Sequence, residues 1–204
     1  MFPVVLDLSG RAVVVVGGGV VGRRKAAAAR AAGAVVRVVD PHPAAPLDFA
    51  HVAEAYRPAH LAGACLAFAC AAPDVNARVV ADAKALGVWV NSATDPAGGD
   101  CVLPAVLHRG GLTVAVSTGG ASPALARRVR EKLEGEFDAA FADWVVLLNE
   151  LRPAIAAAVP DAARRRTLLD ALADWPWLAR IRAEGVEAVR AAMRAEVRAV
   201  SGLS

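Results

Sequence analysis

The sequence predicts an α/β protein built on a parallel, doubly wound sheet, and three observations support this fold class. Four consecutive valines at residues 13–16 are typical of a short buried strand. A glycine-rich turn follows these valines directly and leads into a helical run. Apolar β-branched segments then alternate with helix-like segments as far as residue 90, which is the rhythm of repeated β-α-β units.

The elements of this first half follow from the spacing of apolar residues and from turn signals. Strands are expected at residues 12–16, 35–40, about 51–56, 65–70 and 88–90, and helices at residues 20–32 and 74–86. The strand at 51–56 is the weakest, and Pro58 follows it closely. Gly87 provides a carboxyl-terminal stop for the second helix.

The pattern changes beyond residue 91. A polar, glycine-containing loop is expected at residues 92–100, a short strand at 101–103 ended by Pro104, and a further strand at 112–116. Ser122 is a good helix N-cap, and Pro123 suits the first helical position. These two residues predict a long helix to about residue 151, just before Pro153. The tail over residues 160–200 is expected to be helical, with one break at Gly185.

The turn after the valine strand has the pattern Gly17-x-Gly19-x-x-Gly22. In a dinucleotide-binding turn the first glycine permits the tight turn, the second lets the backbone approach a diphosphate, and the third lets helix and strand pack closely. The first helical amides are unpaired donors that suit an anion. Asp40 ends the next strand, about where an acid holds the ribose 2′-hydroxyl, and would repel a 2′-phosphate. The pattern predicts NAD binding in a Rossmann-type domain; the alternative is a structural turn in another α/β protein.

Composition and charge exclude several classes of protein. The apolar content of 56% predicts a sizeable core rather than a disordered chain. No apolar run reaches the roughly 18 residues that span a bilayer, and an early Asp7 without leading basic residues argues against a secretory signal. We therefore expect a cytoplasmic protein without membrane contact. The net charge of +3 comes without a basic stripe interleaved with aromatics, so nucleic-acid binding is not expected.

The cysteines and histidines do not form a recognisable metal site. Cys65, Cys70 and Cys101 are odd in number and lack zinc-ligand spacing, so the first two are interpreted as buried fillers. No two histidines lie at a spacing that would place them together on one helix; the four are His42, His51, His60 and His108. No dedicated metal site is expected.

Polar residues in the second half offer further candidates, each with an alternative reading. Asp95 precedes Pro96 and either caps that turn or works in a loop at the carboxyl end of a parallel strand; Asp100 lies close by. Ser117 and the small residues after it either form a flexible connection or line a ligand site. The basic residues at 127–132 are either a solvated helix face or a site for carboxylates.

Four stretches of the chain resemble the family of NAD-dependent precorrin-2 dehydrogenases, which also form the amino-terminal part of siroheme synthases. They read VGGGVVGRRKA at residues 16–26, AAPDVN at 71–76, VNSATDP at 90–96 continuing to LPA at 103–105, and LTVAVSTGGASPALAR at 112–127. The last stretch is the most specific. No methyltransferase domain follows, so the chain resembles the stand-alone form.

The resemblance implies three parts and an activity. The parts are a Rossmann domain at residues 1–111, a dimerisation segment at 112–151 and a small helical domain at 152–204, in a homodimer. The implied reaction is oxidation of the tetrapyrrole precorrin-2 to sirohydrochlorin by hydride transfer to NAD⁺, and some members also insert Fe²⁺. A non-catalytic NAD(H)-binding regulatory module and a dehydrogenase of another substrate are the alternatives.

The chain departs from the family pattern in the loop after Asn91. The family commonly has a catalytic carboxylate three residues after this asparagine, where this sequence has Thr94. A carboxylate follows one place later, at Asp95. An unassisted hydroxyl is a poor base near neutral pH, so Asp95 is the expected acid–base group.

The motif and the resemblance together assign the site. Asp95 and Thr94 are the expected catalytic residues. The expected cofactor-binding residues are Gly17, Gly19, Val20, Val21, Gly22, Asp40, Pro41 and Ala72. The expected substrate-binding residues are Asn91, Ser117, Thr118, Gly119 and Arg127.

Overall fold

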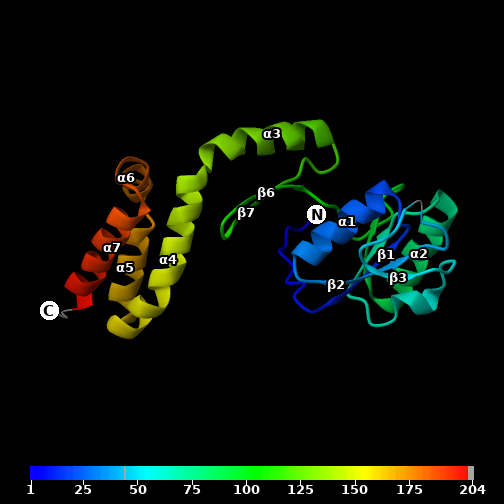
Figure 1. The fold of residues 1–204 in the computed structure, drawn as a ribbon, viewed down its shortest axis with the longest axis horizontal. Coiled ribbons are helices and arrows are strands. Elements are labelled where there is room, and N and C mark those ends of the chain that lie inside the picture. The colour runs from blue at the N-terminus through cyan, green and yellow to red at the C-terminus, as the bar shows by residue number, and fades with distance from the viewer. Residues whose placement is uncertain (44, 202–204) are drawn as a thin grey trace. The chain divides into compact units, whose positions relative to one another are not determined.

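A computed structural model of the chain describes residues 1–43 and 45–201. The chain divides into two compact units, Met1–Leu103 and Pro104–Ser204 (Figure 1). The first unit holds a five-stranded parallel sheet in the order β3-β2-β1-β4-β5, which confirms the predicted fold class. Its strands are β1 (Ala12–Val16), β2 (Val35–Val39), β3 (Ala50–Val52), β4 (Leu66–Ala69) and β5 (Trp89–Ser92).

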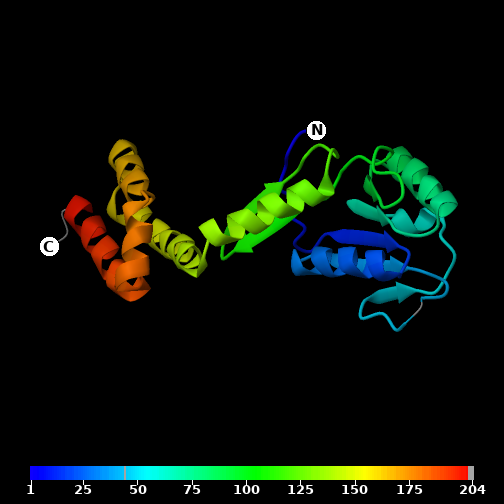
Figure 2. The same ribbon diagram turned by 90° about the horizontal axis from the view of Figure 1, so that it is seen from above.

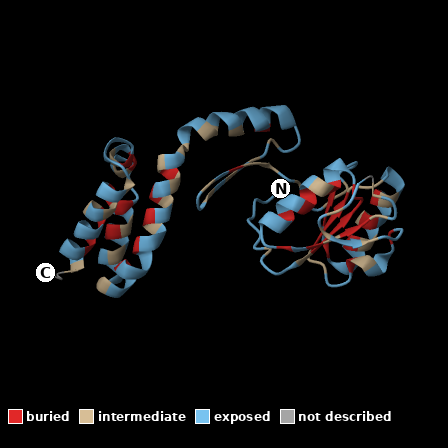
Figure 3. Ribbon diagram, in the orientation of Figure 1, coloured by how far each residue is buried: buried red, intermediate tan, exposed pale blue. Residues whose placement is uncertain are grey.

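Side chains that alternate along the strands build a core on each face of this sheet. Val13 and Val15 of β1 pack toward helix α1 (Val20–Ala31), and Val14 and Val16 pack toward helix α2 (Pro73–Leu86). A short 3₁₀ helix, η1 (Pro58–Leu61), adds the buried Leu61 to the α2 side. In Figure 3 the strands of this sheet are largely buried. Both faces are covered, which explains the nearly continuous apolar character of β1 and β4.

The register of the sheet places four loops at one edge. Val16 at the end of β1 pairs with Val39 of β2 and Ala69 of β4, and Ala69 pairs with Ser92 of β5. The chain segments after these strands therefore leave from the same carboxyl edge. Ligands of open parallel sheets bind at this edge.

The second unit consists of a β-hairpin and five helices. Strands β6 (Ala105–Arg109) and β7 (Leu112–Val116) pair antiparallel, and α3 (Pro123–Glu136) packs on them (Figure 2). The helices α4 (Ala139–Ala158), α5 (Ala162–Leu172), α6 (Pro176–Glu184) and α7 (Val186–Ser201) share one apolar core. Leu147 and Met193 are completely buried in it.

The prediction of a strand at residues 101–103 is wrong. This segment has no regular secondary structure, and Cys101 instead closes a loop by donating its N–H to the Val90 carbonyl (3.3 Å). The strand begins only after Pro104, as β6, because its partner is β7 across the Gly110-Gly111 turn. Pro104 lacks an N–H and so marks the start of the strand rather than its end.

The prediction of a single long helix from residue 123 to about 151 is also wrong, because this segment forms two helices. It is divided at residues 137–138, where the Asp138 side chain accepts the N–H of Phe141 (3.0 Å) and begins a new helix, α4. This helix then continues through Pro153. Pro153 lies on the exposed side of α4, and Asn149, to whose carbonyl it cannot donate, is also an exposed residue. The buried stripe of Leu147, Leu151 and Ile155 continues past it on the inner side.

The remaining expectations for the tail are confirmed. Residues 162–201 are helical, and the predicted break at Gly185 separates α6 from α7. A second break, near residue 174, separates α5 from α6. Within the described residues, no helix combines the length and the apolar character that crossing a bilayer requires.

Candidate functional site

The glycine turn after β1 has a shape that side chains would prevent. Gly17 has a positive φ of +102°, and a Cβ there would overlap the Cys70 carbonyl and lie 2.7 Å from the Ala71 nitrogen. A Cβ at Gly22 would overlap the Gly17 carbonyl. These geometries match the turn and packing roles that the motif implies for the first and third glycines.

The second glycine borders open space. Nothing lies within 4 Å of a Cβ built on Gly19, which is the N-cap of α1 and makes no side-chain capping bond. The first intrahelical bond runs from the Arg23 N–H to the Gly19 carbonyl (2.9 Å). The N–H groups of Val20, Val21 and Gly22 precede it and are the free donors of a helix start. Donors, positive dipole end and open space together fit a diphosphate.

Asp40 links the end of β2 to the glycine turn. One carboxylate oxygen accepts the Gly18 N–H (2.6 Å) and the other accepts the His42 N–H (2.8 Å). A carboxylate has about four acceptor positions, so both oxygens keep capacity for a ribose hydroxyl. Pro41 follows on the exposed side of the same loop. The carboxylate is thus held in place before any ligand binds.

Arg23 fixes the same loop from the helix side, a role that the sequence argument did not assign. Its Nε donates to the Gly18 carbonyl (2.8 Å), one terminal nitrogen to the Pro46 carbonyl (2.7 Å), and the other to the Ala45 carbonyl. The guanidinium has five fixed donors and can join two backbone segments in this way. The sequence feature that could have indicated this role is the position of Arg23, a long side chain with several donors directly after the third glycine.

The two expected catalytic residues lie in the exposed loop after β5. The Asp95 Oδ1 accepts the Gly98 N–H (3.1 Å), and the Asp95 N–H donates to the Ser92 hydroxyl (3.1 Å). Asp95 therefore caps a turn, as one reading of the sequence anticipates, and its second oxygen remains for other partners. The Thr94 hydroxyl accepts a hydrogen bond from the Asn76 amide (3.0 Å).

Asn91, expected to bind substrate, lies in the interior. The residue is 5% exposed, its Oδ1 accepts from the Lys25 ammonium, and its Nδ2 donates to the Cys101 carbonyl (2.8 Å). The Lys25 Nζ also lies 5.5 Å from the centre of the Phe68 ring. Asn91 thus joins helix α1 to the far end of the loop that carries Asp95. Sequence reasoning did not single out Lys25.

The cysteines near this lysine are not activated nucleophiles. Burial raises the pKa of the Cys70 thiol, and the nearby Lys25 ammonium lowers it by a smaller amount. Burial also raises the pKa of Cys101, and the Asp100 carboxylate adds to the rise. Among the described residues, no group of three or more His, Cys, Asp or Glu side chains is placed to hold a metal ion.

The other expected substrate residues lie in the second unit. The Ser117 hydroxyl accepts the Gly119 N–H (3.2 Å), and the Thr118 hydroxyl exchanges hydrogen bonds with the Ser122 backbone (3.1 Å each way). Ser122 caps α3 through the Leu125 N–H, as predicted.

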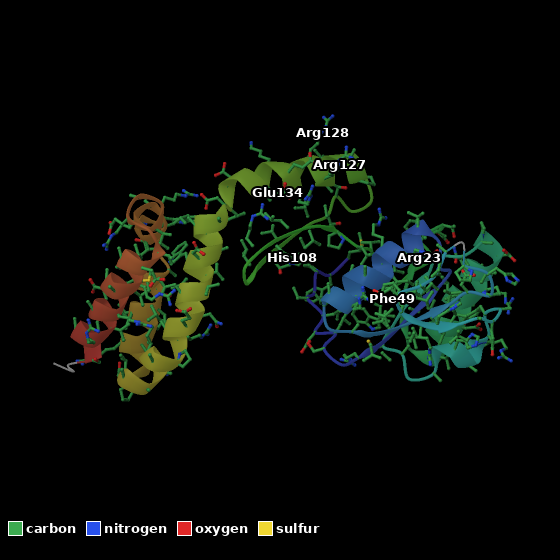
Figure 4. All side chains as sticks on the ribbon, viewed as in Figure 1. Arg23, Phe49, His108, Arg127, Arg128 and Glu134 are labelled. Carbon is green, nitrogen blue, oxygen red and sulfur yellow. The ribbon has the colours of Figure 1, made fainter. Side chains whose placement is uncertain are left out.

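Basic side chains follow in the first turns of α3. Figure 4 labels Arg127 and Arg128 there, and both are exposed. Arg127 lies 3.6 Å from Glu131 one turn along the helix, a spacing of weakly coupled surface charges.

The first unit also has a cavity of about 720 Å³, which the glycine turn and Asp40 do not line. It is lined by residues at the amino ends of the strands, including Ala12, Cys65 and Trp89. The glycine turn and Asp40 lie at the opposite, carboxyl edge, where the sheet topology places a ligand. We therefore assign the candidate site to the carboxyl edge.

Known proteins share this fold and parts of this sequence. The solved structure of SirC, a precorrin-2 dehydrogenase, superimposes with a TM-score of 0.75 and 25% identity, over 95% of this chain and 99% of that one. A siroheme synthase of Chromobacterium violaceum is 34% identical over 183 residues, 86% of this chain and 39% of that protein. Siroheme synthase 2 of Aeromonas hydrophila is 42% identical over 139 residues, 65% of this chain and 29% of that protein.

The chain spans less than two fifths of the length of the curated relatives it matches, between 22% and 39% in the first three. Two family models match along it. The sirohaem biosynthesis protein central model covers residues 109–136, which include the hairpin turn, β7 and α3. The putative NAD(P)-binding model covers residues 4–105, half of the 204 residues, and the chain therefore belongs to this NAD(P)-binding family.

Proposed function

We propose that the chain is an NAD-dependent dehydrogenase that oxidises precorrin-2 to sirohydrochlorin in siroheme biosynthesis. The observation that carries the proposal is the similarity to a precorrin-2 dehydrogenase structure over 95% of this chain and 99% of the other. Similarity to siroheme synthases along up to 86% of the chain supports it. The experiment that tests it is anaerobic turnover of precorrin-2 with NAD⁺ by the purified protein.

The first unit holds the cofactor in this proposal. The α1 amides at Val20, Val21 and Gly22 bind the diphosphate, which lies in the open space beside Gly19. Asp40 accepts the ribose hydroxyls, and Pro41 and Ala72 line the exposed loops on either side of the turn. The bound nicotinamide supplies one chemical function, the acceptance of a hydride. The protein supplies orientation of the two reactants.

In this mechanism, the loop after β5 provides the group that accepts the proton. Dehydrogenation removes two hydrogens from the substrate, one as hydride and one as a proton. The free oxygen of Asp95 takes the proton while its other oxygen keeps the turn closed through Gly98. Asn91, tied to Lys25 and Cys101, holds the base of the loop and thus acts through position rather than contact.

The substrate carboxylates are assigned to the second unit. Precorrin-2 carries eight carboxylates, and an exposed guanidinium such as Arg127 binds a carboxylate by two parallel hydrogen bonds. Ser117, Thr118 and Gly119 offer hydroxyl and amide donors in the turn before α3.

We predict a strong preference for NAD⁺ over NADP⁺. A 2′-phosphate would face the Asp40 carboxylate, which two backbone amides hold in place. The kcat/KM for NAD⁺ should exceed that for NADP⁺ by at least about tenfold, since like charges at close range repel by several kcal/mol. Asp40→Asn should narrow this ratio, whereas Asp48→Asn, at an exposed carboxylate paired with Arg30, should not. Equal use of both cofactors by the wild-type protein would remove the role given to Asp40.

We also predict a homodimer whose interface includes the segment at residues 112–151. Within the described residues, β6 and β7 pair only with each other, so the small sheet has two open edges. Leu125 and Val129 on α3 are 53% and 38% exposed. Sedimentation should show a dimer at sub-micromolar concentration. An active, stable monomer would contradict the proposed assembly and the three-part division on which it rests.

A further inference from the structure

The buried side chain of Asn76 joins two loops at the carboxyl edge of the sheet. Asn76 lies in the first turns of α2 and is 1% exposed. Its Oδ1 accepts the Ala71 N–H (2.8 Å), and its Nδ2 donates to the Ala71 carbonyl (3.0 Å) and to the Thr94 hydroxyl (3.0 Å). Ala71 follows β4 and Thr94 follows β5, the neighbouring strand.

The Ala71 backbone determines which way the Asn76 amide faces. The oxygen and nitrogen of an asparagine amide are assigned from their hydrogen-bond partners. Rotating this amide by half a turn would set its oxygen against the Ala71 carbonyl and its NH₂ group against the Ala71 N–H. Both contacts would be repulsive, so the nitrogen faces Thr94.

This orientation fixes the role of the Thr94 hydroxyl. An amide nitrogen only donates, so the threonine oxygen accepts from Asn76 and its own proton points elsewhere. Within the described part of the chain, that proton has no hydrogen-bond acceptor, and Thr94 is exposed. The buried amide therefore occupies one lone pair of the Thr94 hydroxyl and leaves its proton available for donation at the edge where ligands bind.

We propose that Asn76 is a positioning residue that aims the Thr94 hydroxyl proton at an oxygen of the bound ligand. The inference rests on the proposed function, because the ligand is either the tetrapyrrole, through a carboxylate, or the dinucleotide, through a carboxamide or ribose oxygen. Thr94 then binds and orients; it does not remove a proton. This role uses the hydroxyl at the position where the related family has a carboxylate.

The replacement Asn76→Asp reverses the direction of this hydrogen bond. One aspartate oxygen can still accept the Ala71 N–H. The other loses the hydrogen bond to the Ala71 carbonyl, takes the Thr94 proton and leaves only the threonine lone pairs for the ligand. A purely structural Asn76 would act through Ala71 alone, so its replacement would be equally harmful with or without the Thr94 hydroxyl. A measured interaction energy between positions 76 and 94 therefore distinguishes a positioning role of Asn76 from a purely structural one.

The experiment is a double-mutant cycle with Asn76→Asp and Thr94→Val. NADH dissociation constants are measured by fluorescence, and KM and kcat for precorrin-2 are measured anaerobically. Each single change should weaken one ligand about tenfold, the usual effect of one lost hydrogen bond to a ligand oxygen. The affected ligand identifies the acceptor. In the Thr94→Val protein, Asn76→Asp should add less than about twofold.

Further variants keep the test decisive if Asn76→Asp fails to fold. Thr94→Ser retains the hydroxyl and should lose less than Thr94→Val, whereas Thr167→Val on α5 should change neither ligand. Additive effects in the cycle, or unchanged binding of both ligands by Thr94→Val, would overturn the inference while wild-type turnover upholds the proposed function. A wild-type protein that neither binds NADH nor oxidises precorrin-2 would overturn both.

Discussion

Replacement of Gly19 by valine should abolish binding of the dinucleotide without unfolding the protein. Position 19 has an ordinary backbone conformation, with φ of −69°, and no atom lies within 4 Å of a Cβ built there. The branched side chain would instead occupy the space in front of the α1 amides, which we assign to the diphosphate. The NADH dissociation constant should rise by at least about 100-fold, with the melting temperature nearly unchanged.

Two matched glycine variants make this prediction specific. Gly22→Ala places its Cβ against the Gly17 carbonyl, so it should lower the melting temperature as well as the affinity. Gly135→Val, in α3 with open space around it, should leave NADH binding unchanged. Wild-type NADH affinity in a folded Gly19→Val protein would show that the diphosphate lies elsewhere.

Replacement of Asp95 by asparagine should lower the rate of precorrin-2 oxidation by about 10²–10⁴-fold, the usual contribution of a positioned acid–base group. The asparagine oxygen can still accept the Gly98 N–H, so the turn should survive while the negative charge is lost. NADH affinity should barely change, because the Asp95 side chain is not among the groups that we assign to the cofactor. The measurements are kcat for precorrin-2 and the NADH dissociation constant.

Asp100→Asn is the matched control in the same loop. Its Oδ2 accepts the Val90 N–H (3.2 Å), which gives it a structural role at the base of the loop, and its effect on kcat should be much smaller. Thr94→Ala should also cost much less than Asp95→Asn. If Asp95→Asn is fully active and Asp100→Asn is inactive, the second carboxylate is the base. A fully active Asp95→Asn beside an inactive Thr94→Ala would assign the chemistry to the hydroxyl.

The sheet could be predicted from the sequence because its signals are local. The valines of β1 and β2, the Gly87 stop and the alternation of strands and helices lie within short windows, and the observed strands agree with them to within a few residues. The signal of the Gly17-x-Gly19-x-x-Gly22 turn is equally local, because the glycines are required by close contacts within one strand–turn–helix unit.

The predicted elements are wrong where a local sequence signal is compatible with two different structures. Asp138 followed by Phe141 is a helix start, but the surrounding helix-forming residues hid it inside a longer run. Pro153 predicts the end of a helix, although a proline on an exposed helix face destabilises the helix less than one in its buried interior. Pro104 is compatible with either end of a strand, and only the antiparallel pairing of residues 105–109 with β7 shows that it precedes the strand.

The supporting contacts of the site could not be predicted because they join distant positions. Lys25 and Asn91 are 66 residues apart, Arg23 and Pro46 are 23 apart, and Asn76 and Thr94 are 18 apart. No periodicity connects such pairs, and each depends on which loops the sheet order brings together. Residues that contact a ligand can be proposed from sequence motifs. The residues that hold them in place can be identified only from the three-dimensional structure.

The most direct test of the proposed function is the anaerobic reaction of the purified protein with precorrin-2 and NAD⁺, followed by absorbance. We predict one NADH formed for each precorrin-2 converted to sirohydrochlorin, with no conversion when NAD⁺ is omitted or when Gly19→Val replaces the wild type. Continuing with sirohydrochlorin and Fe²⁺ or Co²⁺ then measures metal insertion separately. A protein that binds NADH tightly but forms none from precorrin-2 would contradict the proposed function and identify a non-catalytic NAD(H)-binding module or a dehydrogenase of another substrate.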